Sequence, residues 1–251
     1  MKRKFSQIFL VRESVAREMI EKMNISEGEY VIEVGPGKGI LTKILLEKKA
    51  RVISIEIDKK LCEYLRKKIL DLDFYLIEGD FLKINTREIL KKINLDRVKL
   101  ISNVPYHITT YFLEKIIKER DCFSEIYLTL QKEVVERIIS KPGTKEYSSL
   151  SIFVNFYMNI EILMPLPSFF FKPKPKVNSL FFKMTPKDSL PQVNEEKFFN
   201  LVRKAFQERR KKISRLLKDF KIQDKVEGDL AEKRPDQLSI EDYLNLYKLI
   251  S

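Results

Sequence analysis

Cysteine and histidine are both scarce in this chain of 251 residues. The two cysteines, Cys62 and Cys122, stand far apart and form no Cys-x-x-Cys pair, which excludes a zinc knuckle and a disulfide framework. Such cysteine usage is typical of a protein of the reducing cytoplasm, where we expect this one, and no metal site is expected. The single histidine, His107, is expected to hydrogen-bond locally at the start of a helix rather than to act as a general base.

Long uninterrupted apolar runs are also lacking. The most apolar region, residues 152–171, contains Asn155, Asn159 and Glu161, which a bilayer-spanning helix would tolerate poorly. The basic first seven residues are followed by charged positions rather than by an apolar stretch, so we expect no signal peptide. The sequence therefore predicts a protein with no membrane segment.

Positive charge is the main compositional excess. The chain has 48 lysines and arginines against 36 acidic residues, a net charge of +12. A polyanionic partner such as RNA would explain this balance. A lysine-rich composition of the whole proteome would explain it equally well, so charge alone does not decide between the two.

Short β-rich runs alternate with amphipathic helical stretches between residues 30 and 131. The runs cover residues 30–34, 51–57, 74–77, 98–102 and 125–130. This alternation predicts an α/β fold with a parallel sheet and crossover helices. Two later strand-like runs, 161–163 and 177–184, are separated by prolines and are expected to close the sheet.

A polar, proline-bearing connector begins at Pro186 and marks the expected domain boundary. We therefore expect a first domain over residues 1–185 and a small all-helical domain over residues 186–251. Apolar positions from Phe199 to Phe220 recur at helical spacing, with lysines and arginines between them. This pattern predicts one basic amphipathic helix.

A glycine-rich turn follows the first expected strand. Its sequence, Glu33-Val34-Gly35-Pro36-Gly37-Lys38-Gly39, places glycine at every second position, which allows a sharp turn and close approach to a ligand. Dinucleotide folds carry the different spacing G-x-G-x-x-G, and here no pyrophosphate needs to be held. With Glu33 in front, the turn favours S-adenosylmethionine, whose amino acid end carries an ammonium group.

Two further acids follow the second and third strands. Glu56 can accept hydrogen bonds from both ribose hydroxyls, with Ile57 beside it, and Asp80 can accept from the adenine amine, with Phe81 flanking the ring. The ends of these strands are where open α/β sheets bind ligands. A nicotinamide-dependent oxidoreductase would share the acid after the second strand, but it would need the other glycine spacing.

The tetrad Asn103-Val104-Pro105-Tyr106 follows the fourth strand. An exocyclic purine amine is a poor nucleophile because its lone pair is delocalised into the ring. The side-chain oxygen of Asn103 and the carbonyl beside Pro105 can each accept one amine hydrogen, while Tyr106 offers a face to the base. The tetrad therefore predicts methyl transfer to a planar amine, with Asn103 also next to the cofactor.

These motifs resemble, in order, those of the KsgA family, the ribosomal RNA small-subunit adenine dimethyltransferases. The resemblance extends over nearly the whole chain and includes Ser6–Leu10, the glycine turn, the tetrad, Gln131–Val134, Tyr147–Ser151, Phe171–Ser179, Phe206–Lys211 and Arg234–Ser239. It implies a Rossmann-like class I methyltransferase sheet with helices on both faces. It also implies that Gln7, Phe9 and Leu10 lie at the cofactor and that Phe171 packs against the flipped target base.

The same resemblance implies the substrate and the partner. These are two adjacent adenosines near the 3′ end of 16S rRNA, each methylated twice at the exocyclic amine, within the immature small ribosomal subunit. A monomer and a role in subunit assembly are expected as well. Lys172, Lys174 and Lys176, interleaved with prolines, would form a basic rim for the RNA backbone.

Some positions depart from the family pattern, and two alternative functions stay open. Ser6, Ile8 and Ser102 replace the usual residues, and the apolar side chain at position 8 cannot make the usual polar contact. An Erm-type 23S rRNA adenine methyltransferase would share the sheet, the tetrad and the Phe171 segment, although the C-terminal blocks favour the KsgA family. A non-catalytic rRNA-binding assembly factor would keep the fold without the reaction.

Overall fold

The computed structural model describes residues 8–215 and 229–250, and its contacts divide the chain into two compact units. The first unit contains residues 1–132 and 159–186, and the second contains residues 133–158 and 187–251. The chain passes from the first unit to the second for the last time after Pro186, one residue beyond the expected domain boundary. The segment 133–158, in contrast, was expected in the first domain and packs with the second unit.

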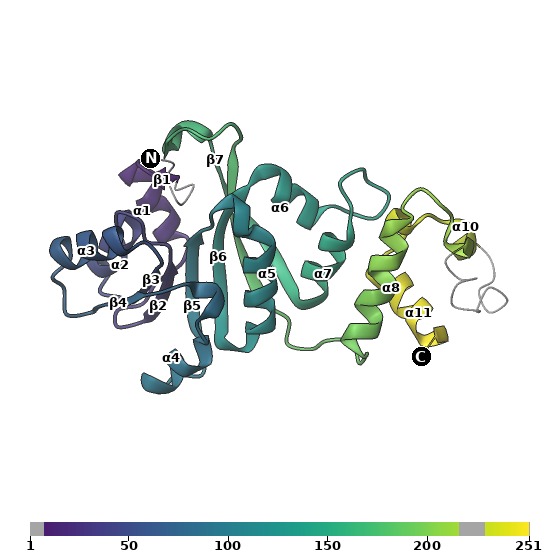
Figure 1. Ribbon diagram of the computed structural model, residues 1–251, viewed down its shortest axis with the longest axis horizontal. Helices are drawn as coiled ribbons and strands as arrows, with labels where there is room; N and C mark the ends of the chain where they lie inside the picture. Colours follow the sequence, from purple (N-terminus) through teal and green to yellow (C-terminus); the bar gives the residue numbers. More distant parts are fainter. Residues whose placement is uncertain (1–7, 216–228, 251) are drawn as a thin grey trace. The chain divides into compact units, whose positions relative to one another are not determined.

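The first unit is built on a seven-stranded sheet (Figure 1). Five strands run parallel in the order β4-β3-β2-β5-β6, β9 pairs with β6 in the antiparallel direction, and β7 forms the edge beyond β9. The strands are β2 (Tyr30–Val34), β3 (Arg51–Glu56), β4 (Phe74–Glu78), β5 (Val98–Asn103), β6 (Phe123–Gln131), β7 (Met158–Leu166) and β9 (Ser179–Pro186). The predicted α/β class and its parallel sheet are confirmed.

Helices connect these strands and cover the sheet. The helices of the first unit are α1 (Glu13–Glu21), α2 (Ile40–Glu47), α3 (Lys59–Lys68), α4 (Thr86–Lys92) and α5 (Thr109–Lys118), with the short 3₁₀ helices η1 (Phe81–Lys83), η2 (Tyr106–Ile108), η3 (Arg120–Cys122) and η4 (Ser168–Phe170). Consecutive residues such as Val31 and Ile32 of β2 are both fully buried. Since neighbouring strand residues point to opposite faces, both faces of the sheet are covered, as a parallel sheet requires.

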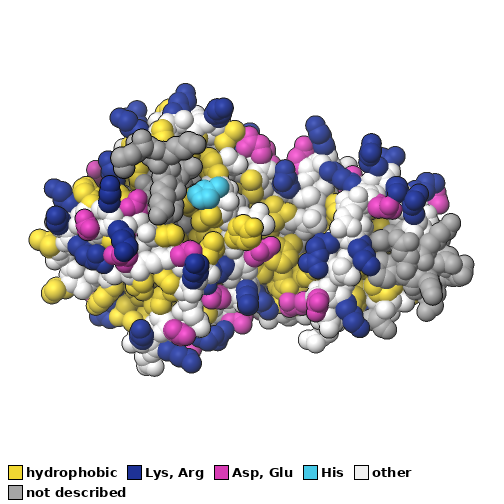
Figure 2. Space-filling model, viewed as in Figure 1, with side chains coloured by type: hydrophobic (Ala, Val, Ile, Leu, Met, Phe, Trp, Pro, Cys, Tyr) yellow, Lys and Arg dark blue, Asp and Glu magenta, His cyan; other side chains and the backbone are white. Residues whose placement is uncertain are grey.

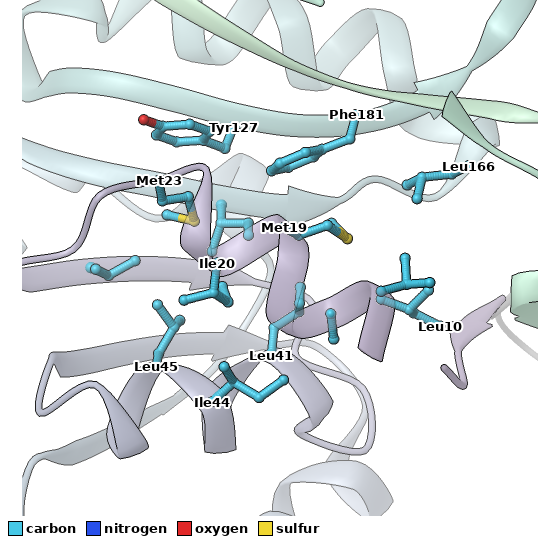
Figure 3. Close-up of a cluster of buried hydrophobic side chains, with 14 of the residues drawn as sticks. Leu10, Met19, Ile20, Met23, Leu41, Ile44, Leu45, Tyr127, Leu166 and Phe181 are labelled. Carbon is cyan, nitrogen blue, oxygen red and sulfur yellow. The ribbon is translucent and has the colours of Figure 1, made fainter. Parts of the chain in front are cut away.

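One large apolar cluster fixes α1 and α2 against the sheet (Figure 3). Met19 and Ile20 of α1 and Leu45 of α2 pack with Tyr127 of β6 and Phe181 of β9. The two aromatic rings stack with centroids 6.0 Å apart. Their burial anchors β6 and β9 beside the strands whose carboxyl ends carry the polar motifs.

A separate two-stranded sheet joins distant parts of the chain. Strand β1 (Phe9–Leu10) pairs in the antiparallel direction with β8 (Phe171–Lys172), so that Leu10 lies opposite Phe171. The amide of Val11 extends the pairing by donating to the Phe170 carbonyl over 2.9 Å. This pairing brings the N-terminal segment beside the proline-rich segment.

The second unit is helical in its described part. Its elements are α6 (Lys132–Ile139), α7 (Ser149–Tyr157), α8 (Glu195–Gln207), α10 (Asp229–Glu232), η6 (Pro235–Gln237) and α11 (Ile240–Ile250). Phe156 of α7, Phe198 of α8 and Tyr247 of α11 meet in an aromatic core. In the part of the chain that the structure describes, no helix is both long and apolar enough to cross a membrane.

The expected continuous helix from Phe199 to Phe220 is wrong. Helix α8 ends at Gln207, and residues 208–211 form a turn in which the Lys211 amide donates to the Glu208 carbonyl. Arg209 is not part of a free basic face, because its guanidinium contacts Asp236 at 3.1 Å and also donates to the Lys145 carbonyl. These long-range contacts override the helical periodicity. The last expected positions, from residue 216 on, lie outside the described residues.

Candidate active site

A cavity of about 600 Å³ lies in the first unit at the carboxyl ends of the parallel strands. This size is typical of pockets for small molecules and cofactors. Its walls come from β1, from the segments that follow β2, β3, β4 and β5, and from Lys172 and Pro173 of the proline-rich segment. The glycine turn, the acids at the ends of β3 and β4, and the tetrad therefore face one shared space.

The glycine turn forms one wall, and its backbone requires glycine. Gly37 has a φ of +59°, and a Cβ placed there would lie 2.8 Å from the Phe9 ring. The ring of Phe9 thus packs directly on the turn, while the ammonium of Lys38 lies 5.9 Å from its centroid. A side chain at position 37 would have to displace β1.

Glu33 lies beneath this turn and is nearly inaccessible. Its side chain is 2% exposed, and one carboxylate oxygen accepts hydrogen bonds from the hydroxyls of Thr42 at 2.6 Å and Ser54 at 3.0 Å. Burial raises the pKa of Glu33 to about 7, although these two bonds oppose the shift. A cationic group in the cavity would favour the ionised carboxylate.

Glu56, at the end of β3, keeps acceptor capacity for a ligand. It accepts from the amide of Asp58 at 2.9 Å and from the amide of Gly37 at 3.4 Å. A carboxylate offers about four acceptor positions, so two ligand hydroxyls can still be bound. Burial raises the pKa of Glu56, and hydrogen bonds from backbone amides oppose this shift. Ile57 beside it is 45% exposed and lines the cavity, where a ligand ring would cover it.

Asp80 and Phe81 form the wall that follows β4. One oxygen of Asp80 accepts from the amide of Leu82 at 3.0 Å and begins the short helix η1. The Phe81 ring is 5% exposed and packs on Phe112, with centroids 5.1 Å apart. Phe81 lines the cavity, but most of its ring lies in the core, so contact with an adenine stays a prediction.

The tetrad occupies the opposite part of the cavity wall. The side-chain amide of Asn103 donates to the backbone carbonyl of Ile8 over 3.1 Å. This bond commits the amide nitrogen and leaves the side-chain oxygen as the acceptor for an incoming amine. Pro105 and Tyr106 line the same space, and Val104, between Asn103 and Pro105, is buried and donates its amide to the Thr129 carbonyl of β6.

The structure brings together nearly all site residues that the sequence predicts. Those that line the cavity are Phe9, Leu10, Glu33, Gly35, Gly37, Glu56, Ile57, Asp80, Phe81, Asn103, Pro105 and Tyr106. Gln7 lies outside the described residues. The cavity-lining residues lie together because the parallel strands that carry them end at one edge of the sheet.

Phe171 is the exception. It does not line the cavity, its side chain is 4% exposed, and it belongs to the apolar cluster that holds α1. The following residue, Lys172, faces the cavity instead, as strand alternation requires. Contact between Phe171 and a target base stays a prediction. In this arrangement of β8 the ring does not reach the cavity.

Several residues of the site were missed by sequence reasoning. Ile8 was set aside because its side chain is apolar, yet its backbone carbonyl is the partner of Asn103. Such a contact is independent of the side chain and leaves no signal in the sequence. Ser54 did leave a signal, because it is a polar residue between the apolar residues Ile53 and Ile55 of β3, and it supports Glu33.

Comparison with known proteins agrees with this geometry. The family model for ribosomal RNA adenine dimethylase matches residues 1–251. The ribosomal RNA small subunit methyltransferase A of Clostridium botulinum (strain Okra / Type B1) is 39% identical over 249 residues, which cover 94% of this chain and 89% of that protein.

Two solved structures resemble the whole chain. A dimethyladenosine transferase from Plasmodium falciparum superposes with a TM-score of 0.79 at 26% identity and covers 95% of both chains. The 23S rRNA methyltransferase ErmE superposes with a TM-score of 0.68 at 22% identity, over 96% of this chain and 99% of that chain, and shows the fold alone. The protein described here therefore belongs to the ribosomal RNA adenine dimethylases, which transfer methyl groups from S-adenosylmethionine to adenine in rRNA.

Proposed function

We propose that this chain dimethylates the exocyclic N6 amines of two adjacent adenosines near the 3′ end of 16S rRNA in the immature small ribosomal subunit. The observation that carries the proposal is the shared cavity, in which the glycine turn and Asn103 face the same space. The small-subunit assignment is supported by the printed name of the Clostridium botulinum relative. We further propose that the protein acts as a cytoplasmic monomer and takes part in subunit assembly.

The residues of the cavity fit S-adenosylmethionine. Glu33 would meet its ammonium group, Glu56 would accept from the ribose hydroxyls, and Asp80 would accept from the adenine amine. Gly37 allows close approach of the backbone because no Cβ occupies the turn. When bound, the sulfonium supplies an electrophilic methyl group.

Asn103 and Pro105 would activate the target amine. The Asn103 side-chain oxygen and the backbone carbonyl beside Pro105 would each accept one amine hydrogen, which would withdraw the nitrogen lone pair from the ring and direct it toward the methyl group. The amine held in this way would take the methyl group that bound S-adenosylmethionine would supply, with the thioether as leaving group. The amine would release one proton to water as it is methylated, so Asn103 and the carbonyl beside Pro105 need only position it, and no strong general base is required.

Substitution of Asn103 tests this role. We expect Asn103→Ala to lower methyl transfer by about a hundredfold or more, since it removes an acceptor aimed at charge that develops in the transition state. Binding to the small subunit should change little. The control is Asn155→Ala, in the second unit, where the amide donates to the carbonyls of Ile138 and Ser151 and does not reach the cavity. Transfer at the wild-type rate by Asn103→Ala would contradict the assignment.

The Erm-type alternative predicts a different acceptor RNA. The similarity to ErmE covers nearly the whole chain, but at 22% identity it supports only a shared fold. Incubation of the enzyme and labelled methyl donor with undermethylated 30S particles and with naked 23S rRNA separates the two. We expect label in the 30S particles, and label confined to 23S rRNA would favour the alternative.

The surface composition is compatible with RNA as substrate. On the face drawn in Figure 2, lysine and arginine side chains are spread widely, with acidic side chains between them. With a net charge of +12, contacts to the phosphate backbone would add sequence-independent affinity. Recognition of the target adenine would then come from the cavity.

A non-catalytic assembly factor would bind the subunit and transfer no methyl group. The intact tetrad and the fit of the cavity support catalysis instead. Wild-type protein that binds 30S particles but transfers no methyl group at any assembly stage would favour that alternative.

A further inference from the structure

A hydrogen bond links the tetrad to the strand that follows the proline-rich segment. The phenolic oxygen of Tyr106 lies 3.0 Å from the hydroxyl oxygen of Ser179, although the two residues are 73 positions apart in the chain. Ser179 is 1% exposed and begins β9, opposite Gln131 of β6. It does not line the cavity, so direct contact with the cofactor does not explain it.

The position of Tyr106 explains why such an anchor is useful. Tyr106 is half-buried and begins η2, a 3₁₀ helix of three residues, which is a weak local restraint. Its backbone carbonyl accepts from the Thr109 hydroxyl over 3.0 Å. The Ser179 bond therefore holds the far end of the same side chain, and together the two contacts restrain the position of the ring at both ends.

Ser179 is itself held rigidly. Its ladder partner Gln131 is the last residue of β6, and the preceding residue Asn178 is held by two hydrogen bonds. The Asn178 carbonyl accepts from the Lys132 amide at 2.9 Å, and its side-chain oxygen accepts from the Ser168 amide at 3.0 Å. A hydroxyl on this support does not shift easily.

We propose that Ser179 is a positioning residue for methyl transfer, acting through the Tyr106 hydroxyl to fix the ring on which the target adenine stacks. This inference rests on the proposed function, in which Tyr106 offers its face to the base. Stacking on an aromatic side chain requires a defined ring position, and a displaced ring would present the amine away from Asn103. Loss of the bond thus affects turnover more than cofactor binding.

A double-mutant cycle tests the coupling. We expect Ser179→Ala and Tyr106→Phe each to lower kcat for undermethylated 30S particles by about five- to tenfold, the value of one neutral hydrogen bond. The double variant should lie within about twofold of the slower single variant, because the second change removes nothing further. The dissociation constant for S-adenosylmethionine should stay at the wild-type value in all three.

Ser151→Ala is the matched control. Ser151 is also 1% exposed, and its hydroxyl donates to the Arg137 carbonyl in the second unit, away from the cavity. It measures what the loss of a buried serine hydroxyl does to thermal stability, and kcat should stay at the wild-type value. If Ser179→Ala does not fold, Tyr106→Phe alone decides, since it removes only the oxygen of a half-buried ring.

Two results would overturn the proposal. One is a wild-type kcat in Tyr106→Phe or in folded Ser179→Ala, and the other is a double variant whose loss is the product of the single losses. Tyr106→Ala separates this inference from the proposed function. If Tyr106→Ala is inactive while Tyr106→Phe is fully active, the ring is needed and only the Ser179 anchor is wrong. If Tyr106→Ala is fully active, the stacking role itself is wrong.

Discussion

Glu33 combines deep burial with a place on the wall of the cavity. Its pKa rises from an ordinary value of 4.5 to about 7, chiefly because burial disfavours the charged form. Between these two pH values the folded state holds more protons at this position than the unfolded chain. The free energy of unfolding therefore falls as pH rises through this window, by about 3 kcal/mol in total from this group.

Glu33→Gln removes this titration and keeps a side chain that can accept from Thr42 and Ser54. We expect denaturant unfolding between pH 4.5 and 7 to show a shallower decline of stability in Glu33→Gln than in the wild type. The control is Glu47→Gln, which removes a carboxylate that is 53% exposed and paired with Arg17. Equal slopes for Glu33→Gln and the wild type would show that Glu33 does not titrate in this range.

Phe171 is the residue for which the resemblance and the structure differ most. Its ring lies in the apolar cluster, so Phe171→Ala would damage the core and could not separate packing from catalysis. Phe171→Leu keeps an apolar side chain of similar volume and should lower stability by only about 1 kcal/mol. If the ring also stacks on the flipped base, methyl transfer should fall by about tenfold, since stacking is worth roughly 1 to 3 kcal/mol.

The control for Phe171→Leu is Phe181→Leu, because Phe181 is another buried aromatic residue of the same cluster. If the Phe171 ring stacks on the base, we expect the two variants to lose similar stability and only Phe171→Leu to lose methyl transfer. Wild-type transfer rates in both would assign Phe171 to the core alone.

At the scale of elements, β1 and the adjoining Ile8 connect the glycine turn with the tetrad. Phe9 packs on Gly37, the carbonyl of Ile8 holds Asn103, and Leu10 pairs with Phe171 of β8. A displacement of this short strand would therefore disturb both halves of the cavity. A substitution that disturbs the contact between Phe9 and Gly37 therefore tests whether β1 holds the cavity together.

We expect Gly37→Ala to weaken S-adenosylmethionine binding by about tenfold or more and to lower methyl transfer with it. The new Cβ would lie 2.8 Å from the Phe9 ring, in a backbone with a φ of +59°. Gly28→Ala, at a φ of +77° with no neighbouring atom within 4 Å, isolates the backbone strain. If titration with the cofactor gives the same affinity for both variants, the close approach of Phe9 does not matter.

At the scale of the molecule, the sequence predicted the sheet well because its signals are local. Strand β2 was predicted with its observed bounds, and β3 to β6 were predicted within two residues at each end. Buried apolar runs bounded by turns specify such strands directly. The acids and the tetrad then fall at one edge without further assumption.

Features that depend on contacts between distant residues could not be predicted in this way. The pairing of β1 with β8, the burial of Phe171 and the carbonyl of Ile8 at Asn103 all join parts of the chain far apart in sequence. Helices α6 and α7 were missed, and α8 was expected to continue too far. Arg209 shows why, since its contacts with Asp236 and the Lys145 carbonyl stabilise a turn where periodicity favoured a helix.

The proposed substrate is tested most directly by mapping the modified nucleotides. Small subunits that lack methylation are incubated with the enzyme and S-adenosylmethionine, and their rRNA is analysed by primer extension and by mass spectrometry of nucleosides. Our account predicts N6,N6-dimethyladenosine at two adjacent positions near the 3′ end of 16S rRNA, and none with Asn103→Ala. Methylated adenine found only in 23S rRNA, or no modification of 16S rRNA at all, would contradict it.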